Sequence, residues 1–167
     1  MEGIVSRTLE VNASPSDTWK VYGSLQLAQI AVDAFPETYI GYKVLQGDGY
    51  AGTIIQVFFA KGVPGPPSYK QEYTVVDDVK RVKVAPTIQG GVLEQGFKRY
   101  VTRLDVKEKV GKPNECTMIG SIEYVLEDKS ALPLVKSSLD GLYDIMKAVA
   151  DYVINHHNNA NANAYTN

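Results

Sequence analysis

The order of hydrophobic and polar positions predicts a series of strands followed by one long helix. Residues 4–11 alternate, with Leu9 and Val11 on one face of a strand and Thr8 and Glu10 on the other. Six further strands are predicted at residues 40–44, 52–59, 69–76, 81–88, 97–106 and 116–125. Turn-forming residues separate them at spacings typical of antiparallel hairpins. We therefore predict a curved, seven-stranded antiparallel sheet, arranged as a meander.

Two short helices are expected between the first and second strands. Ser14 is suited to cap the first helix, and Pro15 fits its first position, where a missing N–H costs little. This helix is broken near Gly23. The second helix carries apolar residues at helical spacing until Phe35 and Pro36 end it.

The last part of the chain predicts a long amphipathic helix over residues 130–154. After Ser130, a suitable cap, apolar residues recur at steps of three and four from Leu132 to Val153. Such a helix spans roughly 37 Å, about the length of a strongly curved sheet, so we expect it to cover the sheet. A coiled-coil seam is the competing interpretation. Residues 155–167 are rich in Asn and Ala without a period, and we predict a disordered tail there.

Composition indicates a single globular domain over residues 1–154. The chain has 167 residues and a formal net charge of −2, with no cluster of Lys or Arg, which argues against nucleic acid as a partner. No apolar stretch approaches the roughly 18 residues of a membrane span. The single cysteine, Cys116, and a first segment without a signal-peptide pattern favour the cytoplasm.

The chain offers little for metal or acyl-enzyme chemistry. Its two histidines, His156 and His157, both lie in the Asn-rich tail, away from Cys116. We therefore expect no metal and no cofactor. Acid–base chemistry then falls to Asp, Glu, Lys or Tyr.

A bent sheet closed by one helix implies an internal apolar cavity, because the helix does not fill the whole concave face. Mostly apolar cavities with a few polar groups bind small molecules. Alternation assigns four residues of one strand to the interior: Tyr69, Gln71, Tyr73 and Val75. Lys83 is flanked by two valines, and alternation alone favours burying the valines and leaving the lysine in water.

Residues 47–52, Gly-Asp-Gly-Tyr-Ala-Gly, match the glycine pattern of dinucleotide-binding proteins. In those proteins a helix N-terminus must follow at once to bind the pyrophosphate. Here residues 53–59 have the pattern of a strand. We therefore interpret the glycines as a tight hairpin loop that shapes the mouth of the cavity.

Several motifs together resemble the plant pathogenesis-related class-ten family, which has the birch pollen allergen fold. The resemblance covers residues 3–154 and rests on the order of elements, the glycine-rich loop at 46–53, the Gln-Gly-Gly turn at 89–91 and the long last helix. Within this family, Pro-Ser-Tyr-Lys at 67–70 and Arg-Val-Lys at 81–83 resemble the norcoclaurine synthase branch. The resemblance implies an α+β helix-grip fold and condensation of dopamine with a phenylacetaldehyde.

The resemblance also implies roles for individual residues. The family's catalytic tyrosine and lysine fall on Tyr69 and Lys83, which places Lys83 inside the cavity. The family glutamate is replaced by Gln71, and its aspartate by Thr102. A buried lysine has a lowered pKa and can exchange protons during imine formation. The Gln71 amide is not a base, so it does not remove the ring proton during cyclisation. Three alternatives remain: Lys83 acts as both acid and base, the substrate does part of the work, or the reaction stops at the imine.

Three functions remain open at this stage. The first is a cytoplasmic plant enzyme of alkaloid metabolism that condenses an arylethylamine with an aldehyde. The second is a carrier of cytokinin-like or phenolic metabolites, which the replaced carboxylates favour. The third is an enzyme of the same fold that uses Lys83 on another carbonyl compound. In each case the partner is a small molecule, and we expect a monomer or a weak dimer.

Strand alternation, with the register that the resemblance implies, predicts the lining of the cavity. Beside Tyr69 and Lys83, the predicted substrate-binding residues on the sheet are Ile55, Val57, Phe59, Gln71, Tyr73, Thr102 and Leu104. Leu142 and Met146 are expected to form the roof from the long helix.

Overall fold

A single antiparallel sheet forms most of the protein. The structure is a computed structural model that describes residues 1–166, with side chains placed through residue 157. The strands are β1 (Glu2–Val11), β2 (Tyr39–Gln46), β3 (Ile54–Phe59), β4 (Ser68–Glu72), β5 (Val75–Asp77), β6 (Val82–Gly90), β7 (Phe97–Glu108) and β8 (Cys116–Leu126). They are ordered β1-β8-β7-β6-β4-β3-β2, and the short β5 pairs with β6. The predicted meander is confirmed from β2 to β8, with β1 added beside β8.

The predicted strand over residues 69–76 is two strands, β4 and β5. The chain leaves its first register at Tyr73, whose backbone N–H donates to the Thr53 carbonyl (2.7 Å), while the next N–H, of Thr74, donates to Val84 (2.9 Å). This irregularity shifts the phase of the chain by one residue, and a shift of one residue moves side chains to the other face. Tyr73 therefore points inward, whereas Val75 is 42% exposed. The prediction that Val75 shares the interior face is wrong.

Both short helices form where the local signals place them. Helix α1 (Pro15–Tyr22) is capped by Ser14, whose Oγ accepts the backbone N–H of Asp17 at 3.1 Å. Helix α2 (Gln26–Ala34) ends at Phe35. The two helices pack against the long helix α3 (Leu132–Thr166).

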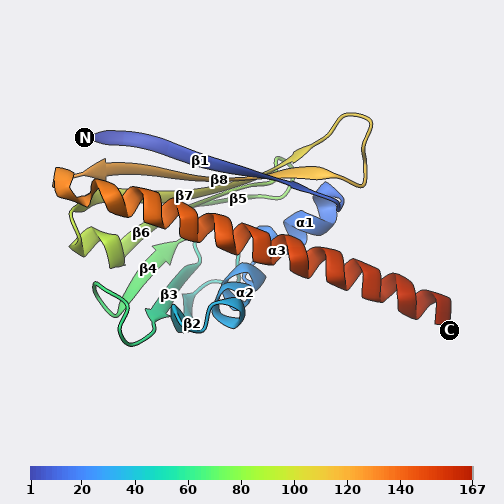
Figure 1. The fold of residues 1–167 in the computed structure, drawn as a ribbon, viewed down its shortest axis with the longest axis horizontal. Helices are drawn as coiled ribbons and strands as arrows, with labels where there is room; N and C mark the ends of the chain where they lie inside the picture. The colour runs from blue at the N-terminus through green and yellow to red at the C-terminus, as the bar shows by residue number, and fades with distance from the viewer. Residues whose placement is uncertain (167) are drawn as a thin grey trace.

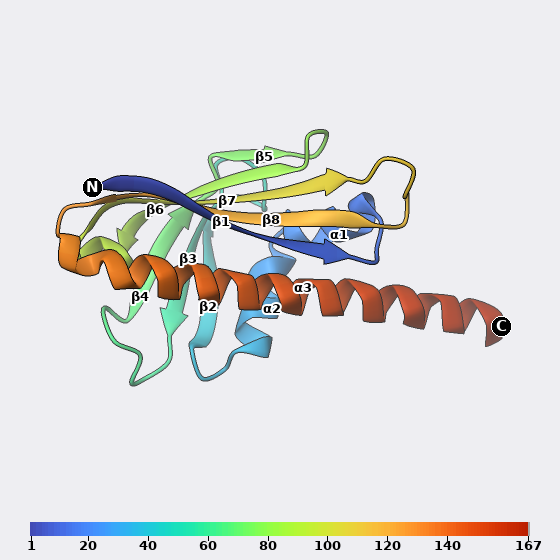
Figure 2. The same ribbon diagram turned by 45° about the horizontal axis from the view of Figure 1, so that its top comes forward.

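Helix α3 runs along the concave side of the sheet and packs on β1 and β8 (Figures 1 and 2). Its stripe Val135, Met146, Val149 and Val153 is buried against the protein's own core, which confirms the covering helix over the coiled coil. The start differs from the prediction. Residues Lys129–Ala131 form a short 3-10 helix, capped by Asp128, which accepts the Ser130 N–H at 2.9 Å.

The C-terminal end of α3 also differs from the prediction. The helix was expected to end at residue 154, before a disordered tail over residues 155–167, but the backbone stays helical to Thr166. The physical reason is that extending an existing helix avoids the cost of nucleating a new one. Asn167 lies outside the described residues. Among the described helices, none is both long and apolar enough to cross a membrane.

Buried side chains gather in three clusters around the concave face. One, with Trp19 and Met118, lies where α1 meets α3; a second, with Phe97 and Ile122, lies at the start of α3. The third, with Ile55 and other residues of β3 and β6, stands on the sheet itself. Strands β2, β3 and β4 turn away from the direction of β1 and β8 (Figure 2). A cavity remains between these strands and α3.

Candidate active site

An internal cavity of about 530 Å³ lies between α3, α2 and the concave face of the sheet. Ten of the residues predicted from the sequence line it: Ile55, Val57, Phe59, Tyr69, Gln71, Tyr73, Lys83, Thr102, Leu104 and Leu142. The size and the mainly apolar walls are typical of a small-molecule site.

Strand pairing explains how residues far apart in the sequence meet here. Val57 is opposite Tyr69 and Ile55 is opposite Gln71 in the β3–β4 pair. On the other half of the sheet, Lys83 is opposite Leu104. Residues directly opposite each other point to the same face of a sheet, so each pair presents two side chains to the cavity.

Met146 does not belong to the cavity, and its predicted place in the roof is wrong. It is 0% exposed and packs in the cluster where α1 meets α3. A Cβ atom added at Gly120 would lie 2.7 Å from the Met146 sulfur, which shows how closely this side chain approaches β8. Its neighbour Ile145 lines the cavity instead, together with Leu142.

Lys83 is buried in the wall of the cavity. Its side chain is 1% exposed, its Nζ donates to the Ser24 carbonyl at 3.4 Å, and Nζ lies 3.8 Å from the centre of the Tyr73 ring. The solvated lysine that alternation favoured is wrong, and the placement implied by the resemblance is correct. The prediction from alternation failed because both faces of β6 are buried at this point. Val82 lies on the face opposite to Lys83, paired with Asp77 of β5 and Asp105 of β7, and is buried as well.

Burial makes Lys83 chemically unusual. The loss of hydration disfavours the ammonium form and lowers the pKa of Lys83 to about 7. The face of the Tyr73 ring partly compensates, because its negative quadrupole attracts a cation. Near neutral pH, Lys83 therefore exists in both protonation states.

Among the described residues that line the cavity, Lys83 is the only charged one. Gln71, where the family glutamate would lie, donates from its amide to the Ala85 carbonyl at 3.5 Å. Thr102, where the family aspartate would lie, shares a hydrogen bond with Tyr100. No described carboxylate lines the cavity to balance the ammonium group.

Three tyrosines that the sequence analysis missed also line the cavity: Tyr39, Tyr42 and Tyr100. Tyr39 stacks on Phe59 (5.9 Å between ring centres), and Phe59 contacts Tyr69 (5.6 Å). Tyr100 could have been found, because it is in phase with Thr102 and Leu104 along one predicted strand. Tyr39 and Tyr42 lie on either side of a register shift in β2, between Tyr39 and Gly41, so strict alternation does not place both on the cavity face.

Burial suits the cavity tyrosines to donate hydrogen bonds. Burial raises the pKa of Tyr39, Tyr69 and Tyr73, and raises the pKa of Tyr100 to about 12 despite its bonds to Ser138 and Thr102. Their hydroxyls therefore keep their protons at neutral pH. Proton acceptance in that range is left to the neutral form of Lys83.

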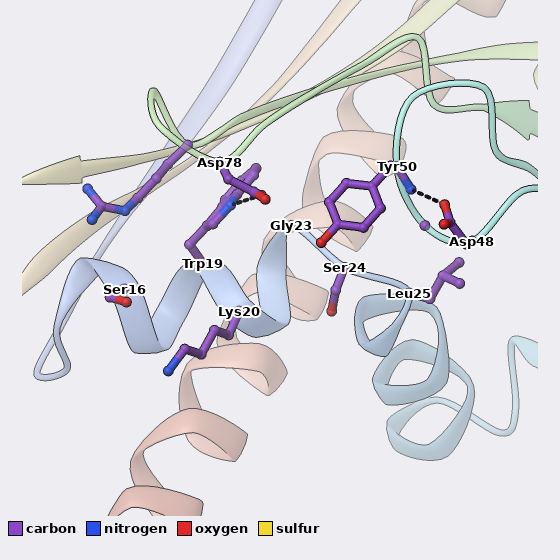
Figure 3. Close-up of a pocket in the computed structure, with 11 residues that line it drawn as sticks. Ser16, Trp19, Lys20, Gly23, Ser24, Leu25, Asp48, Tyr50 and Asp78 are labelled. Carbon is purple, nitrogen blue, oxygen red and sulfur yellow. Dashed lines mark hydrogen bonds between the residues drawn. The ribbon is translucent and has the colours of Figure 1, made fainter.

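A second pocket, of about 420 Å³, lies outside the cavity between α1 and the loop after β2 (Figure 3). Trp19 and Asp78 form one side, where the indole Nε1 donates to the Asp78 carboxylate at 2.8 Å. Tyr50 and Asp48, from the glycine-rich loop, form the other side (Figure 3). This loop lines the second pocket and not the internal cavity, so its predicted place at the cavity mouth is wrong.

The glycine-rich loop is a compact turn without a nucleotide-binding helix. The Gly49 N–H donates to the Thr53 Oγ1 at 2.8 Å, and strand β3 follows directly. Gly47 has φ +86°, and a Cβ there would lie 2.6 Å from the same hydroxyl. The glycines are thus required by the tight turn, and the interpretation as a hairpin loop is confirmed.

Comparison with known proteins assigns the chain to a family, although no family model matches it. Norbelladine synthase from Narcissus pseudonarcissus is 32% identical over 154 residues, which are 92% of this chain and 93% of that protein. The chain belongs to the norbelladine and norcoclaurine synthase family. This confirms the resemblance to the norcoclaurine synthase branch drawn from the motifs.

Two further members of the norbelladine and norcoclaurine synthase family support the assignment. S-norcoclaurine synthase from Thalictrum flavum subsp. glaucum is 31% identical, with 95% of this chain and 74% of that protein aligned. The X-ray structure of norcoclaurine synthase from Thalictrum flavum in complex with dopamine and hydroxybenzaldehyde superimposes with a TM-score of 0.77, at 30% identity, over 93% of this chain and 88% of that chain. The helix-grip fold is therefore shared with norcoclaurine synthase from Thalictrum flavum.

Proposed function

We propose that this protein condenses an arylethylamine with an aromatic aldehyde to an imine, in plant alkaloid metabolism. The observation that carries the proposal is Lys83, the one charged group among the described lining residues of an otherwise apolar and aromatic cavity. Family members bind or make compounds of this class: the Thalictrum flavum enzyme was solved with dopamine and hydroxybenzaldehyde.

The chemistry of imine formation matches a lysine with two accessible protonation states. The substrate amine attacks the aldehyde carbon and gives a carbinolamine, whose hydroxyl leaves as water only after it gains a proton. The Lys83 ammonium supplies that proton, and neutral Lys83 takes a proton from the attacking nitrogen. A general acid–base catalyst works best with a pKa near the working pH, and the pKa of Lys83 is lowered to about 7 by burial.

The tyrosines and apolar walls orient the two aromatic substrates. Tyr69 and Tyr100 present protonated hydroxyls to the cavity, which suits them to donate to a carbonyl oxygen or a catechol. Phe59 and Tyr39 offer ring faces for stacking. Such contacts hold the amine and the aldehyde close together, and this contributes to the rate by proximity.

The polar set supports a reaction that ends at the imine. A Pictet–Spengler ring closure needs a base to remove a proton from the aromatic ring. Gln71 and Thr102 stand where the resemblance places the family carboxylates, and neither side chain is a base at neutral pH. Only Lys83 among the described lining residues titrates near neutrality, and it already serves the dehydration step.

The test is a condensation assay with dopamine and two aldehydes, hydroxybenzaldehyde and 4-hydroxyphenylacetaldehyde. Imine is reduced with borohydride and measured as the secondary amine by mass spectrometry, and chiral chromatography detects any cyclised product. We expect accelerated imine formation by the natural protein and by Lys136→Met, a matched variant at an 86% exposed lysine, and loss of acceleration in Lys83→Met. Binding of both substrates without any rate above buffer would instead support the carrier function.

A further inference from the structure

The Lys83 side chain lines the cavity that the aldehyde is to occupy, and no described carboxylate lines that cavity to hold its amine as an ammonium group. We infer that Lys83 is itself the nucleophile that captures the aldehyde, as a Schiff base on Nζ, and passes it to the arylethylamine by transimination. This inference rests on the proposed condensation, and it replaces the direct attack of the amine on the free aldehyde by a route through a covalent intermediate.

The surroundings of Nζ support this role. Nζ donates one long hydrogen bond, of 3.4 Å, to the Ser24 carbonyl, and it lies 3.8 Å from the centre of the Tyr73 ring. A buried lysine held as a permanent ammonium needs a carboxylate partner, and no described carboxylate lines the cavity. Desolvation in an apolar pocket is one of the ways in which proteins activate a lysine for attack on a carbonyl.

The same surroundings suit the intermediate as well as the free lysine. A protonated Schiff base carries its positive charge on the same nitrogen, so the Tyr73 ring stabilises the iminium as it does the ammonium. The walls formed by Ile55, Val57 and Leu104 are apolar and buried. They keep water away from the C=N bond, which slows its hydrolysis.

The steps balance without an oxidant or a reductant. Neutral Nζ bonds to the aldehyde carbon, and a proton moves from nitrogen to oxygen. The hydroxyl then takes a second proton, supplied by the solvent, and leaves as water, which gives the iminium on Lys83. The substrate amine then bonds to the same carbon. After a proton passes from the substrate nitrogen to Nζ, the bond between carbon and Nζ breaks. Lys83 is released as a neutral amine, and the product is the protonated imine of the two substrates.

The first experiment traps the intermediate with the aldehyde alone. The protein is incubated with hydroxybenzaldehyde and cyanoborohydride at pH 7, and the reduced adduct is located by peptide mass spectrometry. At this pH an amine of pKa about 7 is half neutral, whereas an ordinary lysine of pKa about 10.4 is neutral in roughly one molecule in 2,500. We therefore expect labelling of Lys83 to exceed that of the exposed Lys136 by at least about tenfold. Equal labelling of both lysines, or none at Lys83, overturns the inference.

The second experiment tests whether the adduct lies on the reaction path. The Schiff base is formed first, dopamine is added, and samples are quenched with borohydride over time. We expect the Lys83 adduct to decay at the rate at which the dopamine imine appears. An adduct that persists is a dead end and overturns the inference.

The two experiments separate this inference from the proposed function. Condensation without a Lys83 adduct leaves the proposed function in place and overturns the covalent route. An adduct on Lys83 with no condensation after dopamine is added overturns both the transimination step and the proposed function. Lys136→Met serves as the matched control, because it removes one exposed lysine by the same substitution and is expected to keep the Lys83 adduct.

Discussion

Replacing Lys83 by methionine is expected to stabilise the folded protein at neutral pH, although it removes the group to which we assign catalysis. Methionine has nearly the length of lysine and fills a similar volume, so the cavity wall is preserved. What disappears is an ammonium group that is 1% exposed and has no described carboxylate partner lining the cavity. Loss of turnover should therefore be accompanied by a gain, not a loss, in the free energy of unfolding.

The pH dependence follows from the sign of the pKa shift. Burial lowers the pKa of Lys83 to about 7 in the folded protein, against about 10.4 in an unfolded chain. Between these values the unfolded chain binds more protons than the folded one, so the stability of the natural protein rises with pH. The free-energy penalty for burying the ammonium group is fully present below about pH 7 and is gone above about pH 10.4. Lys83→Met has no such penalty at any pH.

The magnitude can be worked from the shift. At about 1.4 kcal/mol per pKa unit, the full penalty is on the order of 4 to 5 kcal/mol. Loss of the contact with the Tyr73 ring and of the hydrogen bond to Ser24 offsets about half of it. We therefore expect a net gain of about 2 kcal/mol at pH 6 to 7, shrinking steadily toward pH 10.

The assay is urea unfolding of the natural protein, Lys83→Met and Lys136→Met at pH 6, 7.5, 9 and 10. The single tryptophan, Trp19, lies in the core and reports unfolding by fluorescence. The contributions of other titrating groups to the free energy of unfolding cancel when the variants are compared with the natural protein. A gain in stability of the same size at pH 6 and pH 10 would show that the buried Lys83 ammonium group is not its cause. A variant less stable than the natural protein at every pH would show the same.

Three further predictions concern neighbours of Lys83 and the boundary of the cavity. Gln71→Glu restores a base beside the substrate and should add cyclised product, by roughly 10²- to 10⁴-fold, on chiral chromatography; a folded variant that binds both substrates without this product would contradict the assignment of Gln71. Tyr73→Leu removes the ring face that favours the Lys83 ammonium, so the acid limb of the pH–rate profile should move down by about one pH unit. Tyr73→Phe keeps the ring and should leave that limb in place. Equal profiles for both variants would argue against the contact between Lys83 and the Tyr73 ring. Met146→Ala should cost about 2 to 5 kcal/mol of stability in urea yet leave dopamine affinity unchanged, because Met146 lies outside the cavity; a weakened affinity would return Met146 to the roof.

Elements whose signals are local could be predicted from the sequence alone. The Ser14 cap and Pro15 mark the start of α1, and the apolar stripe from Leu132 to Val153 marks α3 along most of its length. Alternation within β3 predicted that Ile55 and Val57 share a face. These signals are readable because they depend on the geometry of one segment and its neighbours along the chain.

Other features depend on contacts between segments that are distant in the sequence. The irregularity after Tyr73 turned Val75 outward, and the approach of β8 to α3 drew Met146 out of the cavity. The burial of Lys83 also depends on tertiary structure. Both faces of β6 are covered at this position, so alternation along the strand does not distinguish a buried face from an exposed one. Strand register, helix position and the pKa of a buried amine all depend on partners far away in the sequence. A local pattern of polar and apolar residues does not specify those partners. The reactive, buried amine of Lys83 therefore could not be predicted from such a pattern.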